Sequence, residues 1–475
     1  MTRNFRSVKP IFNLNSRQVC IETYGCQMNV SDSEVVLSIL EKAGYSLCDN
    51  VDKASLVLIN TCSIRENAEQ KIWSRLEQLR SLKRKNPSLI IGVLGCMAER
   101  LKENLLENGV ADIVAGPDSY RSLPTLLEAL STGEKQVNTL LSQEETYADI
   151  SPVRMDKNGI SAFIAIMRGC NNYCSYCVVP YVRGRERSRN PQTILREAEE
   201  LFVNGYREVT LLGQNVNSYK WEDVTGSKIS FAELLAMVAH INPLLRVRFS
   251  TSHPKDIDNS VLHAIAKHDN ICKHIHLPAQ SGSSSVLKKM RRTYTREKYL
   301  DKIHKIWEFI PEASISTDII AGFSGETEED HHQTLSLMRH VGYYTAFMFQ
   351  YSERPGTKAA ESLPDDVAPE VKNRRLNEII ALQNELSHES NKKDIGKVYE
   401  VLVEGFSKRS KEQLFGRTSQ NKVCVFPAED HKVGDYVKVL ISSCTSATLI
   451  ARTVIPDDIN RESHQHSCNT SGNNN

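Results

Sequence analysis

The sequence lacks any run of apolar residues that approaches the roughly 20 needed for a membrane-spanning helix. Its first residues, MTRNFRSVKPIFNLNSRQVC, contain basic side chains but not the apolar segment of a secretory signal. We therefore predict a cytoplasmic protein with no membrane partner. The chain also lacks a large excess of positive or negative residues, since its formal net charge is +1. Binding to a polyanion must then depend on local basic patches.

The chain has enough length and apolar content for several folded domains. Its 475 residues suggest roughly three domains, and 40% of them are hydrophobic. Twelve cysteines occur without an export signal. In a reducing compartment such cysteines are more often metal ligands, catalytic groups or buried apolar residues than disulfides.

The pattern predicts an α/β protein with three domains and a tail. Strand-like segments alternate with helical ones over residues 17–130, which favours a parallel sheet covered by helices. Residues 131–160 lose this periodicity and are predicted to be a linker. A second α/β run, with strand candidates at 208–216, 245–252, 274–281, 315–323 and 345–352, suits a full or partial (β/α) barrel.

After a long helix at 373–393, short alternating strands predict a small β-barrel, a type often used for single-stranded nucleic acid. The domain boundaries that we predict are 17–135 for the N-terminal sheet domain, 156–388 for the (β/α) barrel and 392–455 for the small β-barrel, with a disordered polar tail at 456–475.

Three cysteines lie within the segment RGCNNYCSYCVVPYVRGRERSR, at positions Cys170, Cys174 and Cys177. Their soft thiolates suit zinc or an iron–sulfur cluster. A structural zinc site normally has four protein ligands, and a cubane cluster normally has four cysteines. Three ligands therefore leave one iron of a cubane free to bind a substrate. The alternative is a zinc loop completed by Cys272 or by a histidine.

A second set of three cysteines occupies equivalent positions in the N-terminal domain. Cys26, Cys62 and Cys96 each follow an apolar strand and precede a helix. Carboxyl ends of parallel strands meet at one crevice, and helix N-termini favour thiolates. The three could thus form one three-ligand site, although each alone could be an ordinary buried cysteine. The remaining cysteines are predicted to be core or surface residues: Cys20, Cys48, Cys272, Cys424, Cys444 and Cys468.

Two three-cysteine sites on two α/β domains, followed by a small β-barrel, resemble the methylthiotransferases, a family of radical S-adenosylmethionine (SAM) enzymes. The resemblance covers roughly residues 17–455. Within the family, the motifs YGCQMN, NTCSIRENAEQK, RGCNNYCSYCVVPYVRGRERSR and GRTSQNK are most similar to those of the branch that modifies tRNA. The C-terminal module is similar to the TRAM RNA-binding domain.

This resemblance implies two [4Fe-4S] clusters and SAM as cofactors. The cluster on Cys170, Cys174 and Cys177 would bind SAM at its open iron and generate a 5′-deoxyadenosyl radical, which makes these residues catalytic. The cluster on Cys26, Cys62 and Cys96 would hold sulfur. One SAM would methylate that sulfur and a second would yield the radical.

The implied product carries a methylthio group at carbon 2 of an isopentenylated adenine beside the anticodon. The implied partners are the anticodon stem-loop of tRNA, an electron donor such as flavodoxin or ferredoxin, and a sulfur carrier. The close alternatives are methylthiotransferases for threonylcarbamoyladenosine in tRNA or for a ribosomal-protein aspartate. A more distant alternative is a non-enzymatic RNA-binding protein with structural zinc.

Polar residues at the ends of the barrel strands are the candidates for SAM contacts: Gln214, Asn215, Ser250, Gln280 and Gly322. The alternative is that they cap loops.

Arginines at alternate positions predict a contact with an anion. The residues Arg183, Arg185, Arg187 and Arg189 would share one face of an extended segment, and arginine binds phosphate bidentately. Two further basic stretches, 288–298 and 408–422, together with Phe415 and Phe426 on the small barrel, favour RNA. A solvated charged face, local pairing with Glu186, or a role beside SAM are the alternatives.

Overall fold

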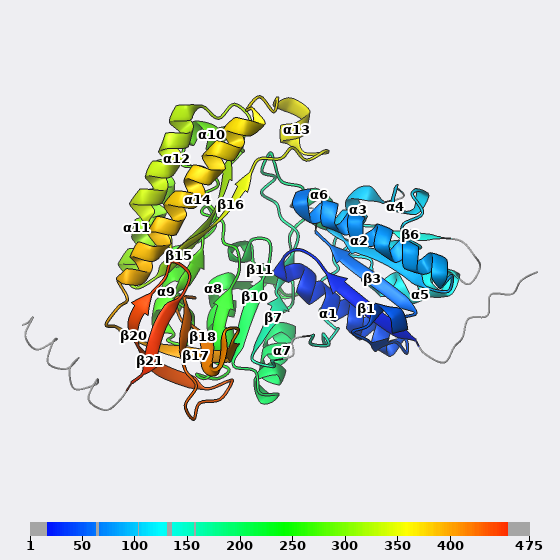
Figure 1. The fold of residues 1–475 in the computed structure, drawn as a ribbon, viewed down its shortest axis with the longest axis horizontal. Coiled ribbons are helices and arrows are strands. Elements are labelled where there is room, and N and C mark those ends of the chain that lie inside the picture. Colours follow the sequence, from blue (N-terminus) through cyan, green and yellow to red (C-terminus); the bar gives the residue numbers. More distant parts are fainter. Residues whose placement is uncertain (1–16, 63–65, 103, 131–134, 156–157, 455–475) are drawn as a thin grey trace, which may run out of the picture. The chain divides into compact units, whose positions relative to one another are not determined.

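The computed structural model describes residues 17–62, 66–102, 104–130, 135–155 and 158–454. Contacts divide the chain into two compact units (Figure 1). Unit 1 consists of residues 1–155, 168–171 and 178–187, and unit 2 consists of residues 156–167, 172–177 and 188–475. Unit 1 therefore includes two short segments from the cysteine and arginine motif.

Unit 1 is built on a six-stranded parallel sheet in the order β2-β1-β3-β4-β5-β6. Its strands are β1 (Gln18–Thr23), β2 (Ser46–Leu47), β3 (Leu56–Thr61), β4 (Ile90–Gly95), β5 (Ile113–Ala115) and β6 (Gln136–Asn138). Its helices are α1 (Gln27–Lys42), α2 (Glu66–Lys85), α3 (Cys96–Leu101), α4 (Asn104–Glu107), α5 (Leu123–Ala129) and α6 (Val179–Arg183).

Both faces of this sheet are buried, as the apolar runs in its strands predict. Alternate strand residues such as Leu58 and Leu94 pack with α1 and α5 in one cluster. Their neighbours Val57 and Val93 pack with α2 and α3 in another. The parallel sheet domain predicted from the sequence is thus confirmed.

The stretch predicted to be a linker differs from that expectation. Strand β6 pairs with β5 in parallel, with Ile113 opposite Gln136. Tyr147 and Ile150 are buried in the core of unit 1. Residues 136–153 therefore extend the N-terminal domain, because a strand of three residues gives too short a pattern to recognise in the sequence.

Unit 2 contains a partial barrel of six parallel strands. They are β7 (Ser161–Ala165), β10 (Glu208–Leu212), β13 (Arg246–Phe249), β14 (His274–His276), β15 (Ser314–Ala321) and β16 (Thr345–Gln350). Three pair in the order β13-β10-β7 and three in the order β14-β15-β16. A parallel bridge between Val247 and Ile271 links the two halves.

Helices follow the barrel strands on the outside. They are α7 (Pro191–Val203), α8 (Phe231–Ala239), α9 (Asn259–Lys267), α10 (Ser284–Lys289), α11 (Arg296–Phe309), α12 (Glu328–Val341), α13 (Lys358–Ser362) and α14 (Pro369–Lys392). Two short pairs, β8 (Met167–Arg168) with β9 (Arg187–Ser188) and β11 (Lys220–Glu222) with β12 (Lys228–Ser230), lie outside the main sheets.

The two faces of the barrel strands differ in polarity. Val209, Leu211 and Val247 belong to the core that packs against the helices. Because side chains alternate along a strand, residues such as Thr210 and Arg248 point to the opposite face. The inner face of the partial barrel is consequently polar.

The C-terminal module is a closed barrel in the order β17-β18-β19-β21-β20. Its strands are β17 (Val398–Ser407), β18 (Ser410–Thr418), β19 (Val423–Pro427), β20 (Tyr436–Cys444) and β21 (Leu449–Thr453). Phe426 on β19 is buried in its core, whereas Phe415 on the neighbouring strand β18 is partly exposed. The small barrel predicted from the sequence is confirmed, and the predicted disordered tail lies outside the described residues.

The turn between β18 and β19 closes one end of the partial barrel. Arg248 donates to the carbonyl of Thr418 (2.9 Å), Lys273 N–H donates to Ser419 (3.0 Å), and Ser314 donates to the carbonyl of Gln420 (2.6 Å). Lys273 and Ser314 lie at the starts of β14 and β15. The turn therefore sits at the amino-terminal ends of the strands, opposite the end where barrel active sites form.

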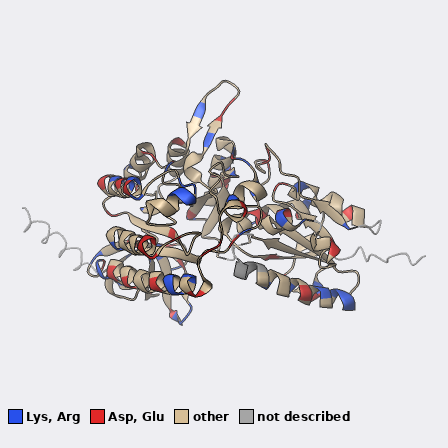
Figure 2. Cartoon of the chain, turned by 90° about the horizontal axis from the view of Figure 1, so that it is seen from above, with Lys and Arg blue, Asp and Glu red and all other residues tan. Residues whose placement is uncertain are grey.

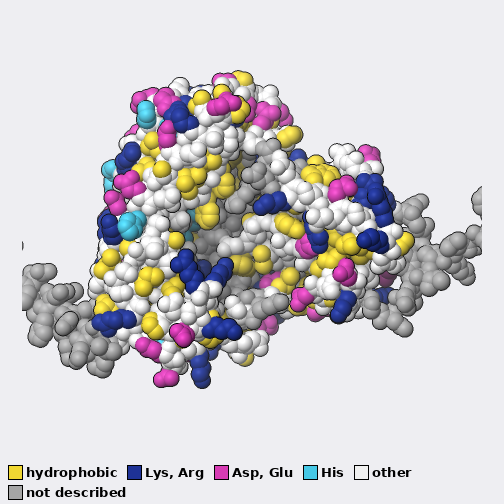
Figure 3. All heavy atoms as spheres, in the orientation of Figure 1, with side chains coloured by type: hydrophobic (Ala, Val, Ile, Leu, Met, Phe, Trp, Pro, Cys, Tyr) yellow, Lys and Arg dark blue, Asp and Glu magenta, His cyan; other side chains and the backbone are white. Residues whose placement is uncertain are grey.

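Basic and acidic residues are interspersed along the helices (Figure 2). The face drawn in Figure 3 likewise mixes basic, acidic and apolar side chains. No helix among the described residues is long and apolar enough to cross a membrane.

Candidate functional site

Cys26, Cys62 and Cys96 lie at the carboxyl edge of the unit 1 sheet. Cys26 directly precedes α1, Cys62 directly follows β3, and Cys96 begins α3 after β4. Gly25 has a φ of +123°, and a Cβ added there would lie 2.3 Å from Cys62 Cβ. A glycine is therefore required at this position, since only its missing side chain lets the two cysteine segments approach.

The thiols of this set interact with one another and with a cation. A hydrogen bond with Cys62, together with the nearby charge of Arg183, lowers the pKa of Cys26 to about 6. Burial raises the pKa of Cys96, and the Arg183 guanidinium acts in the opposite direction. The Nε atom of Arg183 lies 3.3 Å from Cys96 Sγ. The structure thus places all three cysteines in one electrostatic neighbourhood, as their positions in the sequence predict.

These cysteines form a donor set suited to a cluster. In the part of the chain that is described, no three His, Cys, Asp or Glu side chains are arranged to hold a single metal ion. Cysteine sulfurs are the soft donors that iron–sulfur clusters take. The residues present therefore fit a cubane bound through three cysteines.

Arg183 is held in place by a buried polar network. Its Nη2 atom donates to Asp32 (2.9 Å) and to Asn29 (3.0 Å), and Asn29 Oδ1 also lies 3.6 Å from Cys26 Sγ. Asp32 is fully buried and also forms an ion pair with Arg168. Two guanidinium groups thus share one carboxylate beside the cysteines.

The prediction that the alternate arginines bind RNA is wrong for three of the four. Arg183 pairs with Asp32, Arg187 with Asp118 (2.9 Å), and Arg189 with Glu197, and all three arginines are buried. Arg185 alone of the four is exposed. A buried charge needs a partner of opposite charge. For Arg183 and Arg187 this partner lies far away in the sequence, so the motif alone does not indicate it.

The second cysteine motif occupies the loop after β8. Cys170 N–H donates to the carbonyl of Gly184 (3.1 Å), and Cys177 N–H donates to the carbonyl of Cys174 (3.0 Å). Gly169 has a φ of +78°, and a Cβ there would lie 2.0 Å from the Arg185 carbonyl oxygen. All three cysteines are partly exposed, which leaves their thiols accessible to a cofactor.

One arginine of the basic stretch 288–298 lies against this motif. Arg292 donates through Nη1 to Cys174 Sγ at 3.3 Å. Its other nitrogens donate to Tyr294 (2.8 Å) and to the carbonyl of Pro278 (3.0 Å). The expectation that this stretch contacts RNA is therefore wrong for Arg292, although Lys288, Lys289, Arg291 and Lys298 are exposed.

The SAM-contact candidates differ in whether their polar atoms already form hydrogen bonds within the protein. Asn215 donates to Asp256 (2.7 Å), and Ser250 bonds with the backbone of Gly213 at 3.2 Å. The Oε1 atom of Gln214 and the Oδ1 atom of Asn215 are buried without a partner among the described residues. These two oxygens remain available to a ligand.

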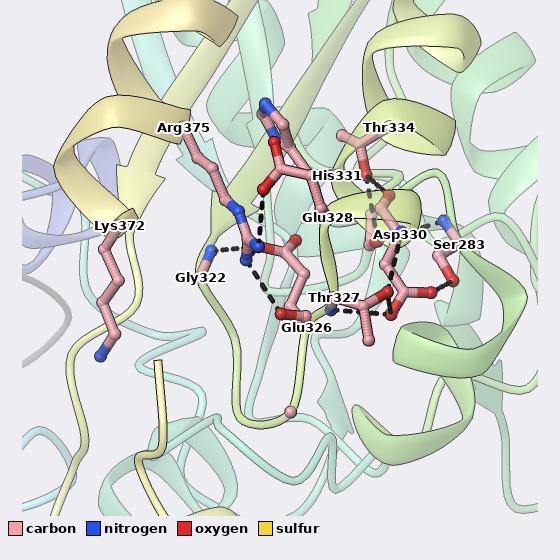
Figure 4. Close-up of polar contacts among 12 residues, drawn as sticks. Ser283, Gly322, Glu326, Thr327, Glu328, Asp330, His331, Thr334, Lys372 and Arg375 are labelled. Atoms are coloured by element: carbon pink, nitrogen blue, oxygen red, sulfur yellow. Dashed lines mark hydrogen bonds and ion pairs between the residues drawn. The ribbon is translucent and has the colours of Figure 1, made fainter. Parts of the chain in front are cut away.

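Gly322 and Gln280 have structural roles at the ends of their segments. Gly322 N–H donates to Glu326 (2.7 Å), which also accepts from Arg375, as Figure 4 shows. Lys372 packs so closely that a Cβ on Gly322 would lie 2.3 Å from it. Gln280 has a φ of +68°, and its N–H and carbonyl bridge to β15.

Asn217 is a further candidate, beyond those predicted from the sequence. Both its side-chain oxygen and its side-chain nitrogen are buried without a partner among the described residues. It lies in the same loop after β10 as Gln214 and Asn215. The available signal was the density of amides in the segment GQNVNS.

The other cysteines match their predicted roles where they are described. Cys20, Cys272 and Cys424 are buried, and Cys48 and Cys444 are partly exposed. Cys468 lies outside the described residues. Burial raises the pKa of the Cys272 thiol.

Comparison with known proteins agrees with this arrangement of domains. Residues 18–116 match the uncharacterized protein family UPF0004, residues 164–338 the Radical SAM superfamily, and residues 392–454 the TRAM domain. A radical S-adenosylmethionine methyltransferase, TsrM, from Kitasatospora setae shares the fold with a TM-score of 0.54 and 16% identity, over 73% of this chain and 74% of that chain. The fold and the cysteine motif thus define a radical SAM enzyme.

Two relatives identify the branch of this superfamily. The tRNA-2-methylthio-N(6)-dimethylallyladenosine synthase of Amoebophilus asiaticus is 60% identical over 447 residues, which are 92% of both chains. The enzyme of the same name from Bacteroides thetaiotaomicron is 58% identical over 435 residues, covering 92% of this chain and 96% of its own. The chain therefore belongs to the family of tRNA-2-methylthio-N(6)-dimethylallyladenosine synthases.

Proposed function

We propose that the protein transfers a methylthio group to carbon 2 of N6-dimethylallyladenosine beside the anticodon of tRNA. The single observation that carries this proposal is the approach of Cys26, Cys62 and Cys96 at one sheet edge, in a chain that also has the three-cysteine radical SAM motif. A second cysteine set distinguishes a sulfur-inserting enzyme from one that only cleaves SAM. Identity of 57–60% to relatives named for this reaction supports the substrate.

Two [4Fe-4S] clusters and SAM are the cofactors. One is held by Cys170, Cys174 and Cys177, and the other by Cys26, Cys62 and Cys96. When bound, the first supplies the electron for reductive cleavage of SAM, and the second supplies the sulfur that is transferred. The protein contributes the ligands, their positions and the exclusion of side reactions.

The loop after β10 supplies polar groups for SAM. Gln214, Asn215 and Asn217 present buried amide atoms that no described residue satisfies. Such atoms cost free energy unless a ligand or water bonds them. The amino and carboxylate groups of SAM are partners of the right polarity. Ser250, Gln280 and Gly322 complete this end of the barrel by shaping the backbone of their loops.

The tRNA contact includes the hairpin between β17 and β18. Lys408, Arg409 and Lys411 are exposed there beside Phe406, an aromatic ring that is 55% exposed. Cations next to an exposed ring suit a phosphate backbone with an unstacked base. The further partners in this proposal are an electron donor such as flavodoxin or ferredoxin and a sulfur carrier, and the proposed location is the cytoplasm.

The test is nucleoside mass spectrometry after anaerobic incubation with SAM and a reductant. Three forms of one tRNA are compared, carrying N6-dimethylallyladenosine, unmodified adenosine or threonylcarbamoyladenosine at the same position. We expect the methylthio product from the first form and little from the others. Equal turnover of all three would contradict the proposed substrate, and preference for threonylcarbamoyladenosine would assign the chain to the alternative branch. A colourless, zinc-containing protein would exclude the enzyme altogether.

A further inference from the structure

Each of the two cysteine sets includes one thiol that contacts a buried arginine. In unit 1, Arg183 Nε lies 3.3 Å from Cys96 Sγ, and the Arg183 side chain is 4% exposed. In unit 2, Arg292 Nη1 lies 3.3 Å from Cys174 Sγ, and this residue is 9% exposed. Both contacts join residues that are far apart in the sequence, so the feature became visible only in the fold.

Both arginines are held rigidly in place by their remaining nitrogens. Arg183 is bound by Asp32 and Asn29 through Nη2. Arg292 is bound by the hydroxyl of Tyr294 through Nε and by a backbone carbonyl through Nη2, and its guanidinium lies 5.1 Å from the centre of the Tyr294 ring. Neither guanidinium can swing away from its sulfur without breaking these bonds.

Two buried arginines near Cys96 share a single carboxylate. Asp32 is the carboxylate that pairs with Arg183, but it also pairs with Arg168. Two cations therefore share one anion in a site where all three side chains are at most 4% exposed. Screening by water and salt is weak at such a depth.

We propose that Arg183 and Arg292 are positioning residues that separately raise the reduction potentials of the two clusters, each through an N–H···S hydrogen bond to one ligand thiolate. Reduction adds a negative charge to a cluster, and a nearby cation with a donor to sulfur stabilises the reduced form more than the oxidised form. Hydrogen bonds to the sulfurs and net charge are the protein's main controls over such potentials. This inference rests on the proposed cluster ligands.

The experiment measures each cluster by itself. In one protein Cys170, Cys174 and Cys177 are changed to Ala, which leaves the cluster of unit 1. In the other, Cys26, Cys62 and Cys96 are changed to Ala. Each is combined with Arg183→Gln, Arg183→Lys, Arg292→Gln or Arg292→Lys. Iron is counted first, and the midpoint potential is then followed by electron paramagnetic resonance during a redox titration.

We expect Arg183→Gln to lower the potential of the unit 1 cluster and to leave the other cluster unchanged. Arg292→Gln should lower the potential of the cluster on Cys170, Cys174 and Cys177 and leave the unit 1 cluster unchanged. Each variant is therefore a control for the other. The Lys variants keep the charge but lose the planar donor, and should shift the potential less. Arg187→Gln is the matched control. Arg187 belongs to the same segment and to a buried ion pair, but it donates to Asp118 and to the carbonyls of Ser142 and Glu145 instead of to a cysteine.

An unchanged potential in variants that retain their iron would overturn the proposal. Arg183→Gln should fold, because Asp32 keeps Arg168 as its partner. If both Arg183 variants lost iron as Cys96→Ala does, while Arg187→Gln retained it, the residue would be structural and the proposal wrong. If neither parent protein held about four irons as one cubane, the ligand assignment itself would fail, which is a separate result.

Discussion

Arg417 of the small barrel forms an ion pair with Glu208 at the start of β10, with 3.3 Å between Nη2 and Oε1. Glu208 is buried and also accepts from Arg248 at 2.7 Å. Lys422, from the same basic stretch, is buried and donates to Ser390 in the last turn of α14 (3.0 Å). Two of the five cations that the sequence assigned to RNA therefore attach the module to neighbouring parts of unit 2.

The remaining cations of this stretch should contact tRNA phosphates. We expect Lys408→Gln, Arg409→Gln and Lys411→Gln to reduce the slope of log affinity against log salt by about 0.7–0.9 for each lost contact. Binding titrations at several salt concentrations measure it. Arg417→Gln is the control, and it should leave the slope unchanged while lowering the melting temperature. If the salt slope decreased only for Arg417→Gln, Arg417 would be the residue that contacts phosphate and the other three would not.

Deleting residues 392–475 should destabilise the rest of the protein as well as weaken tRNA binding. The deletion leaves Glu208 without its ion pair to Arg417. It also removes the turn at Ser419 and Gln420, which forms hydrogen bonds with the starts of the barrel strands. The melting temperature and the iron content of the truncated protein, measured together, test this. A truncated protein with unchanged melting temperature would show that the module is not needed to close the barrel.

The two cysteine sets should fail in different ways. Cys174→Ala should abolish SAM cleavage, because it removes a ligand of the radical-generating cluster. Cys62→Ala should spare some 5′-deoxyadenosine formation but abolish methylthiolated product. Chromatography of nucleosides and of SAM products from one reaction measures both. Multiple turnovers of methylthiolated tRNA by the Cys62 variant would contradict the sulfur-holding role.

Asp32 should be among the residues that stability depends on most. Asp32→Ala leaves Arg168 and Arg183 buried without their shared anion. Breaking a buried pair from one side costs about 3–5 kcal/mol. Denaturant unfolding of the variant and of the wild type measures the decrease in the free energy of unfolding. The matched control is Asp149→Ala, since Asp149 is 71% exposed in its pair with Arg121 and should change stability by about 0–1 kcal/mol.

Asp330 at the start of α12 should make stability depend on acid pH. Burial opposes its ionisation, but hydrogen bonds from Ser283 and Thr327 (Figure 4) and from Ser285 lower its pKa to about 2. A carboxyl with a lowered folded-state pKa stabilises the fold above its usual pKa near 4 and loses this contribution as the pH falls toward 2. The difference in melting temperature between wild type and Asp330→Asn should therefore be full at neutral pH and shrink below pH about 4. A difference that did not depend on pH would contradict this assignment.

The sequence alone was sufficient for the class of chemistry and for the order of the domains. Cys170, Cys174 and Cys177 are close in the chain, so their spacing predicts a cluster loop without any fold. Cys26, Cys62 and Cys96 needed one further step, namely that parallel strands end at a common edge, and the sheet order confirms it. Long apolar periodic segments likewise predict strands and helices because their pattern is local.

The partners of the charged residues were decided only by the tertiary structure. Arg183 and Arg417 have the same appearance in the sequence as cations that bind RNA, yet one meets Asp32 and the other Glu208. An arginine in a motif carries no mark of the carboxylate it will face when that carboxylate lies many residues away. The residue types and local spacing determined the cofactor chemistry, whereas the burial and pairing of charge, which depend on contacts between distant segments, emerged only when the chain was folded.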